Sequence, residues 1–430
     1  MRSLDPQAES LNDRIHRDNP AIYDLLSAKG KAVYFPHLGI VKQSADARGK
    51  AIDATIGIAV EDDGTPMRFH AIADRLRVDP KQSFTYASSY GKPELRKKWQ
   101  EMIRAKNPSM KATVSLPVVS HALTHGLSLA GYLFVDPGDV ILVPDMYWEN
   151  YDLLFGLAYG AKLSFFNTFK GQGLDLDAFE KGLKALGPKK IVLLTFPNNP
   201  TGYTPTEAEQ EHMVRLLTAE AEAGHRVLVL ADDAYFGLVY ESGVARESIF
   251  ARLADGHENL LAVKIDGATK EDYVWGFRVG FVTYGSRGIT AATCSALEDK
   301  TAGALRGSIS NASHLSQTLV FEGFSAPDYD TVKKEKYEIL KNRYQRVKAV
   351  LAANGKRYAD AFTPLPFNSG YFMCVKLAEG LSAEAVRQTL LAKYDTGVIA
   401  LGRLIRVAFS AVPEGKIEPL FENIYKACRE

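Results

Sequence analysis

Short apolar runs alternate with helical segments through the first two-thirds of this chain. The apolar runs, each suited to a buried strand, are 116–119, 139–143, 190–196, 226–230 and 260–265. Because strands that are joined by helices run parallel, the alternation predicts an α/β fold in which helices cover both faces of a mostly parallel sheet. Polar residues follow these runs, at the strand ends that face the ligand crevice in such sheets.

Helix signals and a later strand complete the expected organisation. Helices are predicted over 11–28, 94–106, a segment ending at Phe134, and 328–353, whose charged run 333–336 indicates a solvated face. Thr206 and Glu209 form a capping-box pattern before a helix that runs to Ala223. A second strand is expected from Trp275 to Phe281, and a strand-rich tail begins near residue 368.

Composition restricts the classes of protein that remain. The chain has 430 residues and a formal net charge of +1, which fits a globular protein of two domains and argues against a nucleic-acid or membrane-surface role. The three cysteines are widely spaced, the N-terminus lacks an apolar signal segment, and no run is apolar enough to span a membrane. A cytoplasmic location is therefore expected.

Lys270 follows the apolar run 260–265, and Arg278 comes eight positions later (278 − 270). A lysine at the end of a buried strand can form a Schiff base with an aldehyde cofactor, and the arginine can hold the phosphate of that cofactor. Taken alone, the two residues are better explained as a surface lysine and as an arginine in an ion pair with an acidic residue. Polar residues at other strand ends change this balance.

Two of these strand ends carry acidic or amide side chains. Asp232 and Asp233 follow the run 226–230, and a buried carboxylate there needs a partner such as a protonated pyridine nitrogen. Asn199 lies between Pro197 and Pro200 after the run 190–196, in a rigid turn where either X–Pro bond could be cis. Both positions favour a cofactor at this edge of the sheet.

Other residues suit the phosphate and the ring of such a cofactor. Thr124 opens the helix that ends at Phe134, and a helix N-terminus is a natural seat for phosphate. Tyr86 precedes another helix and has a hydroxyl to donate, and Trp148 follows the run 139–143, where it would stack on a flat ring or belong to the core. His121 and His125 are four apart, but they lack the further ligands of a metal site.

Together these segments resemble the class I/II aminotransferases, pyridoxal-phosphate enzymes of fold type I, and most of all their aspartate and aromatic subgroup. The matching segments are 199–202, 232–235, Lys270 with Arg278, and Arg406, within a likeness that covers about residues 50–410. The resemblance implies a large domain with a mostly parallel seven-stranded sheet between helices and a smaller α+β domain. The implied division is 1–69 (first part of the small domain), 70–335 (large cofactor-binding domain) and 336–430 (remainder of the small domain).

The resemblance also implies a set of site residues, with no metal among their ligands. Lys270, Asp232 and Tyr235 would be catalytic, with Asp232 keeping the pyridine nitrogen of pyridoxal 5′-phosphate protonated. The implied cofactor-binding residues are Tyr86 (from a second subunit), Leu123, Thr124, His125, Trp148, Asn199, Asp232, Tyr235, Thr269, Lys270 and Arg278. The implied substrate-binding residues are Gly57, Trp148, Asn199, Arg306 and Arg406.

The implied activity is the transfer of an amino group between an L-amino acid and a 2-oxo acid, by a ping-pong mechanism through Lys270 in a homodimer with shared active sites. Arg406, inside an apolar strand, would bind the substrate α-carboxylate, although a structural salt bridge would also explain it. Arg306 resembles the partner-subunit arginine that binds a side-chain carboxylate in aspartate aminotransferases. An ordinary interface arginine is equally open, so acidic and aromatic substrates both remain.

Two departures and three other functions qualify this expectation. Ala122-Leu123-Thr124 stands where the subgroup often has Ser-Gly-Thr, and Gly267 stands where it often has a serine, so two phosphate hydroxyls are missing. A pyridoxal-phosphate-dependent C–S β-lyase would use the same lysine and aspartate. A cofactor-sensing regulator would carry a DNA-binding domain ahead of the fold, and only about 50 residues precede the likeness. A nicotinamide site fails because no GxGxxG follows a strand.

Overall fold

A seven-stranded sheet forms the centre of the protein, in the order β2-β10-β9-β8-β7-β3-β4. The structure, a computed structural model, describes residues 4–18, 20–34, 39–73 and 78–430. All neighbouring strands from β9 to β4 are parallel, and β10 is antiparallel to both of its neighbours. The strands are β2 (Val118–His121), β3 (Val140–Pro144), β4 (Lys162–Phe166), β7 (Lys189–Thr195), β8 (Arg226–Asp232), β9 (Leu260–Gly267) and β10 (Val279–Gly285). The α/β fold with a mostly parallel seven-stranded sheet is confirmed.

Successive side chains of the central strands enter two different hydrophobic cores. In β7, Ile191 and Leu193 belong to one core and Val192 and Leu194 to the other. This is the pattern of a strand buried on both faces, which explains its continuous apolar sequence. The helices around this sheet are α6 (Pro93–Lys106), α7 (Ala122–Phe134), α8 (Leu176–Ala185), α9 (Glu207–Glu222), α10 (Ile249–Leu253), α12 (Ala291–Ile309) and α13 (His314–Phe324).

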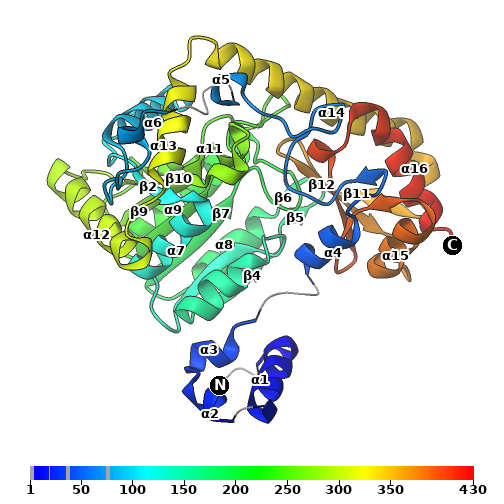
Figure 1. The fold of residues 1–430 in the computed structure, drawn as a ribbon, viewed down its shortest axis with the longest axis horizontal. Helices are drawn as coiled ribbons and strands as arrows, with labels where there is room; N and C mark the ends of the chain where they lie inside the picture. Colours follow the sequence, from blue (N-terminus) through cyan, green and yellow to red (C-terminus); the bar gives the residue numbers. More distant parts are fainter. Residues whose placement is uncertain (1–3, 19, 35–38, 74–77) are drawn as a thin grey trace.

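A smaller sheet of order β11-β12-β15-β14 lies beside the large one (Figure 1). Its elements are β11 (Phe362–Pro364), β12 (Phe372–Leu377), β14 (Ile399–Leu401) and β15 (Leu404–Ala408), with helices α15 (Ala383–Lys393) and α16 (Ile417–Ala427). The chain reaches it through α14 (Tyr329–Tyr358), one long helix that spans from the large sheet to the small one (Figure 1). An earlier segment also joins it, because β1 (Ile52–Asp53) pairs with β13 (Thr396–Gly397). The domain boundaries drawn from the resemblance stay a prediction.

Short elements complete the described chain. They are α4 (Ile40–Asp46), α5 (His70–Ala73), η1 (Pro80–Gln82), the π-helical turn η2 (Asp152–Leu157), β5 (Phe169–Lys170), β6 (Gly173–Leu174), α11 (Ala268–Glu271), η3 (Trp275–Phe277), η4 (Phe409–Ala411) and η5 (Glu414–Lys416). Within the described ranges, no helix combines the length and the apolar character that crossing a membrane requires.

Several local predictions were confirmed and others were wrong. The capping box of Thr206 and Glu209 is formed at the start of α9, and both X–Pro bonds of the turn 197–200 are cis. The single helix expected over 11–28 was wrong: the structure has α1 (Pro6–Asp18), α2 (Pro20–Leu25) and α3 (Ala28–Ala32), and residue 19 lies outside the described residues. Pro20 begins α2, because a proline fits the first turn of a helix but not its interior.

Two further predictions also need correction. The strand expected from Trp275 begins only at Val279, because the chain first makes the turn η3 and a left-handed residue at Arg278 (φ 56°). The charged run 333–336 is not uniformly solvated, because Lys336 is buried and forms an ion pair with Glu61 at 2.8 Å.

Candidate active site

A cavity of about 610 Å³ opens at the carboxyl ends of the large sheet's central strands, beside the small sheet. Most of the residues predicted for the site line it together. They are Gly57, Leu123, Thr124, Trp148, Asn199, Asp232, Tyr235, Lys270 and Arg406. These residues come from segments that are far apart in the sequence, so the fold has brought them to one place.

Asp232 ends β8 and is almost fully buried. Its Oδ2 accepts a hydrogen bond of 2.5 Å from the hydroxyl of Tyr151, and its Oδ1 accepts one of 3.3 Å from the amide of Ala234. Burial raises the pKa of Asp232 to about 6, although the Tyr151 hydroxyl and the charge of Lys270 both act to lower it. A carboxylate of this kind is well placed to accept a hydrogen bond from a protonated nitrogen.

Lys270 lies on the short helix α11, directly after β9. Burial lowers the pKa of Lys270 to about 8; the charge of Arg278 also lowers it, and that of Asp232 raises it. The hydroxyl of Tyr371 donates to the backbone carbonyl of Lys270 at 2.7 Å, which holds the turn in place. At pH 7 an amine with this pKa is neutral in about a tenth of the molecules, far more often than an ordinary lysine, and this neutral fraction can act as a nucleophile and as a base.

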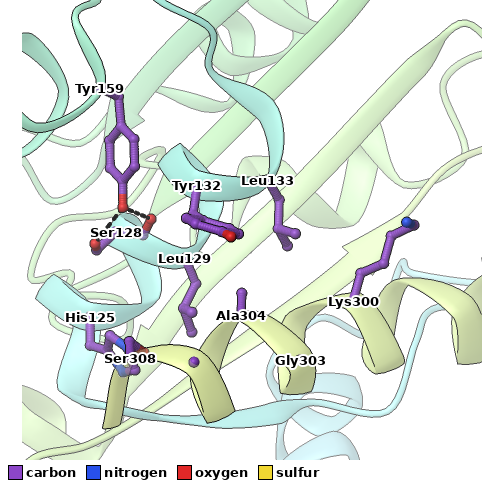
Figure 2. A pocket seen from close by; sticks show the side chains of 11 residues that line it. His125, Ser128, Leu129, Tyr132, Leu133, Tyr159, Lys300, Gly303, Ala304 and Ser308 are labelled. Carbon is purple, nitrogen blue, oxygen red and sulfur yellow. Dashed lines mark hydrogen bonds between the residues drawn. The ribbon is translucent and has the colours of Figure 1, made fainter.

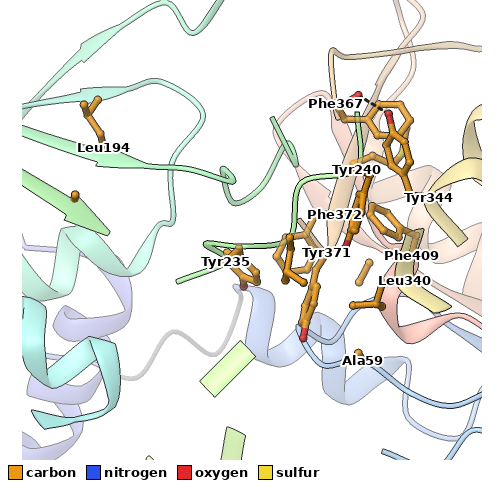
Figure 3. Close-up of a cluster of buried hydrophobic side chains, with 14 of the residues drawn as sticks. Ala59, Leu194, Tyr235, Tyr240, Leu340, Tyr344, Phe367, Tyr371, Phe372 and Phe409 are labelled. Atoms are coloured by element: carbon orange, nitrogen blue, oxygen red, sulfur yellow. Dashed lines mark hydrogen bonds between the residues drawn. The ribbon is translucent and has the colours of Figure 1, made fainter. Parts of the chain in front are cut away.

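Tyr235 belongs to a cluster of aromatic side chains that extends from the cavity to the small sheet (Figure 3). Its ring makes edge contacts with Tyr371 and Phe372, at centroid separations of 5.3 and 5.4 Å. The Nζ of Lys270 lies 5.5 Å from the centroid of the Tyr235 ring. Burial raises the pKa of Tyr235, so its hydroxyl stays protonated and remains a hydrogen-bond donor.

Arg406 is buried on the central strand β15 of the small sheet. Its Nη1 donates to Oδ1 of Asn199 at 3.2 Å and its Nη2 to the carbonyl of Thr55 at 2.8 Å, while its Nε has no partner. The ring of Phe372 lies 4.5 Å from its guanidinium carbon. Among the described residues no carboxylate lies within ion-pair distance of Arg406, and Glu149 acts on it only from farther away, so the guanidinium can bind an anion from outside the chain.

The backbone at the start of α7 is tightly packed. Ala122 has a positive φ of 61°, and its carbonyl accepts a hydrogen bond of 2.8 Å from Ser120. A Cβ on Gly280 would lie 2.5 Å from the carbonyl carbon of Ala122, so only glycine permits this approach. Near this point Thr124 lines the cavity, and the hydroxyl of Thr269 is buried without a hydrogen-bond partner.

Comparison with known proteins settles the family. The model of the family "Aminotransferase class I and II" matches residues 60–424. The chain belongs to the class I and II aminotransferases. It is 23% identical to an aspartate aminotransferase of Bacillus sp. (strain YM-2) over 76% of this chain and 79% of that protein. It is 27% identical to an aspartate aminotransferase of Sulfurisphaera tokodaii over 50% of this chain and 51% of that protein, so this match spans about half the relative's length.

Solved structures show the same fold at low sequence identity. An aminotransferase of Anaerococcus prevotii superposes with a TM-score of 0.82 at 20% identity, covering 94% of this chain and 100% of that one. A kynurenine aminotransferase of Pyrococcus horikoshii, solved in complex with PMP, superposes with a TM-score of 0.78 at 16% identity, covering 95% of this chain and 98% of that one.

Class I and II aminotransferases use pyridoxal 5′-phosphate, and the residues of this aminotransferase-family cavity fit that group. The N–H groups in the first turn of α7, which have no partner within the helix, the unpartnered hydroxyl of Thr269 and the half-buried Arg278 suit its phosphate. Asp232 suits its ring nitrogen, and the neutral form of Lys270 suits its aldehyde. The glycine at position 267 removes one hydroxyl from this set, in keeping with the departure seen in the sequence.

Five residues predicted for the site do not line this cavity: Thr269 and Arg278, which suit the phosphate as described above, and His125, Tyr86 and Arg306. His125 turns into a groove between α7 and α12, where its Nε2 lies 3.1 Å from Oγ of Ser308 (Figure 2). Burial lowers the pKa of His125 to about 4, so the ring is neutral there. Tyr86 is 87% exposed and Arg306 is also exposed, on the last turn of α12.

Other residues of the cavity were missed in the sequence. Tyr151 follows Trp148 closely, yet a tyrosine there gave no sign that it would reach Asp232; its hydroxyl also lies 2.7 Å from Oγ1 of Thr195. The mouth of the cavity is lined by Arg48 and by α4. Nothing in the pattern of this N-terminal stretch indicated that it would reach a site formed two hundred residues later, because the contact depends on β1 joining β13.

Proposed function

We propose that this chain is a pyridoxal-phosphate-dependent aminotransferase that moves an amino group between an L-amino acid and a 2-oxo acid. The observation that carries the proposal is Arg406, a buried arginine without a carboxylate partner in the same cavity as Lys270 and Asp232. Amino acids and 2-oxo acids share a carboxylate next to the reacting carbon. A two-pronged bond from Arg406 to that carboxylate would place the reacting carbon beside Lys270.

The other residues of the cavity have distinct tasks in such a reaction. When bound, the cofactor supplies an electron-withdrawing ring that stabilises negative charge on the substrate carbon. Lys270, with its lowered pKa, takes a proton from that carbon and returns one during the transfer. Asp232 holds a proton on the nitrogen that faces it, and Tyr151 orients Asp232. Tyr235 and Asn199 provide polar hydrogens near the reacting atoms, and Gly57 leaves room for the substrate.

Acidic amino acids are the substrates that the named relatives support, and aromatic amino acids stay open from the resemblance in the sequence. Named relatives include aspartate aminotransferases and an LL-diaminopimelate aminotransferase of Dehalococcoides mccartyi, which is 27% identical over 59% of this chain and 62% of that protein. The mouth of the cavity combines the apolar side chains of Val41 and Ile56 with the cation Arg48. This mixed lining is compatible with both substrate classes.

A homodimer with shared sites is part of the proposal. Tyr86 and Arg306, which would serve the neighbouring subunit, lie in segments that contact each other. The hydroxyl of Ser89 donates to the carbonyl of Ser310 at 2.9 Å, and Oγ1 of Thr85 lies 3.2 Å from Nδ1 of His314. The exposed Phe84, at 88%, adds apolar surface to this face. An exposed face of this composition is suited to packing against a second copy.

An absorbance titration of cofactor-loaded protein without any oxo acid tests the proposal. L-aspartate, L-glutamate, L-alanine and L-phenylalanine are added in turn, with Lys270→Ala as the control that cannot bind the cofactor covalently. We expect the band of the lysine-bound cofactor to convert to the pyridoxamine form with acidic or aromatic donors. Conversion by acidic donors that is lost in Arg306→Ala would assign Arg306 to the side-chain carboxylate.

Other outcomes of this titration would redirect the assignment. Release of pyruvate and ammonia from cystathionine or cysteine, without conversion by any donor, would indicate the β-lyase instead. The absence of any lysine-bound band in the wild-type protein would remove Lys270 from the site.

A further inference from the structure

Two carboxylates directly follow Lys270 in the chain, and both are buried. Glu271 is 6% exposed and Asp272 is fully buried. Glu271 is held from both sides: Nζ of Lys106, on α6, lies 2.7 Å from its Oε2, and Nζ of Lys333, on α14, lies 2.8 Å from its Oε1. Burial alone would raise the pKa of Glu271, but the two lysines outweigh it and lower the pKa to about 2. Glu271 is therefore an anion at any ordinary pH.

Asp272 shares one of these lysines. Its Oδ1 accepts hydrogen bonds from the hydroxyl of Tyr329 at 2.6 Å and from Lys333 at 3.2 Å. Its Oδ2 is buried without a partner, and burial raises the pKa of Asp272. Lys333 is thus the cation common to both carboxylates. Removing its charge would leave two buried acids facing one lysine, a strongly unfavourable arrangement.

This network also contacts the chain segment that carries Tyr235. Gly237 has a φ of 93°, and a Cβ there would lie 2.4 Å from Oε1 of Glu271. The carboxylate of Glu271 therefore fills the space beside the turn that follows Tyr235. The two segments that present Lys270 and Tyr235 to the cavity rest against the same charged group.

We propose that Lys333 is a positioning residue for Lys270, acting through its ion pairs with Glu271 and Asp272. The helix α11 is only one turn long, closed by the amide of Asp272 bonding to the carbonyl of Ala268 at 3.1 Å. So short a helix has little stability of its own. Lys333 and Lys106 hold it from α14 and α6, and this fixes the direction in which the Lys270 side chain leaves the backbone.

The helix that carries Lys333 also contacts the small sheet. It lies in the first half of α14, and farther along the same helix Arg343 donates to the carbonyl of Ser410 at 2.7 Å, beside the small sheet that carries Arg406. One helix therefore contacts the segment of the reacting lysine near its start and, at its middle, the segment after the carboxylate-binding strand. The relative placement of these two groups rests on α14.

The test compares Lys333→Met with Lys334→Met, its neighbour on the solvent side of α14, and with Lys333→Arg, which keeps the charge. Hydrogen exchange is measured in cofactor-free protein over the peptide that contains residues 268–273. We expect exchange in this peptide to become about tenfold faster in Lys333→Met, because the turn loses its anchor. Exchange should stay at the wild-type rate in the other two variants.

A second readout rests on the proposed function. In cofactor-loaded protein, the pH midpoint of the lysine-bound band should change in Lys333→Met, because a loosened turn no longer fixes Lys270 relative to Asp232 and Arg278, the two charges that, after burial, set its pKa. Asp232 and Arg278, the charged groups that face Lys270, are unchanged.

Distinct outcomes separate the two proposals. Unchanged exchange and an unchanged midpoint in a Lys333→Met protein that merely melts earlier would reduce Lys333 to a structural residue. Equal effects of Lys334→Met would also overturn the proposal. If Lys333→Met does not fold, Lys106→Met loosens the same turn from the other side and is measured in its place. A wild-type protein without a lysine-bound band would count against the proposed function alone, because the exchange measurement needs no cofactor.

Discussion

The hydroxyl of Tyr151 donates a 2.5 Å hydrogen bond to Oδ2 of Asp232, and both side chains are buried. This bond favours the ionised carboxylate, so its removal raises the pKa of Asp232 above the value of about 6 that burial produces. In Tyr151→Phe we expect the acidic limb of the kcat/KM profile to move to higher pH and kcat to fall about tenfold. Tyr147→Phe, a neighbouring tyrosine that bonds Asp152 instead, is the control. An unmoved acidic limb would contradict the role of Tyr151.

A second prediction concerns the cost of burying Lys270. Its pKa is lowered from 10.5 to about 8, so the unfolded chain binds the proton more tightly than the folded one between these values. The free energy of unfolding of the cofactor-free protein should therefore rise with pH from 8 to 10.5, by up to about 3 kcal/mol from this group. Lys270→Met should remove this rise. Urea unfolding at pH 7.5 and pH 10 measures the free energy of unfolding at each pH. An equal change between the two pH values in the wild type and in Lys270→Met would disprove the prediction.

Substrate binding by Arg406 should depend on the planar shape of its guanidinium group more than on its positive charge. Arg406→Lys keeps a cation but loses the planar fork that binds a carboxylate in two places, so kcat/KM for every amino acid should fall about a hundredfold. The absorbance of the bound cofactor should change little, because Arg406 is predicted to bind the substrate and is connected to the cofactor site only through its hydrogen bond to Asn199. Arg403→Lys, on the exposed turn before β15, should behave as the wild type. A substrate-selective loss would argue against binding of the shared α-carboxylate.

Gly267 offers a test of the missing phosphate hydroxyl. The subgroup that this chain resembles often has a serine there, so Gly267→Ser would be expected to strengthen cofactor binding. The structure predicts the opposite, because a Cβ at this position would lie 2.6 Å from the carbonyl oxygen of Val279. Gly267→Ser should lower the melting temperature and weaken cofactor binding in a fluorescence titration. Gly276→Ala, with nothing within 4 Å of the added carbon, is the control.

The sequence predicted the elements whose signals are local. The strands β7, β8 and β9 were found within one or two residues at most ends, because strands buried on both faces are continuously apolar. The capping box of α9 depends on residues only three apart and was also found. The strand β4 was missed, because its sequence Lys-Leu-Ser-Phe-Phe is partly exposed and lies at the edge of the sheet.

The site was predicted where side chains follow strands and missed where they arrive from elsewhere. Asp232 was predicted for the site because it ends an apolar strand, and Asn199 because it lies in the turn that follows one. Tyr151, Arg48 and Lys333 depend on packing between distant segments, and no local pattern records such contacts. The expected partners of the cavity across a dimer, Tyr86 and Arg306, stay predictions, as does the placement of His125 on the phosphate.

The helix α14 limits how this protein can be recombined with its relatives. A chimera that takes everything after residue 335 from a relative would cut α14 just beyond Lys333, and residues 336–358 of the helix would then come from the relative. Arg343 in that part bonds Asp62 at 2.9 Å as well as the carbonyl of Ser410, so the incoming helix would have to match an acceptor that stays behind. A crossover after Tyr358 would keep the whole helix together with its contacts to Glu271, Asp272 and Asp62, and only the backbone carbonyl at position 410 would come from the relative. Family-shuffling libraries should therefore be richer in active members at that junction than at the domain boundary read from the sequence.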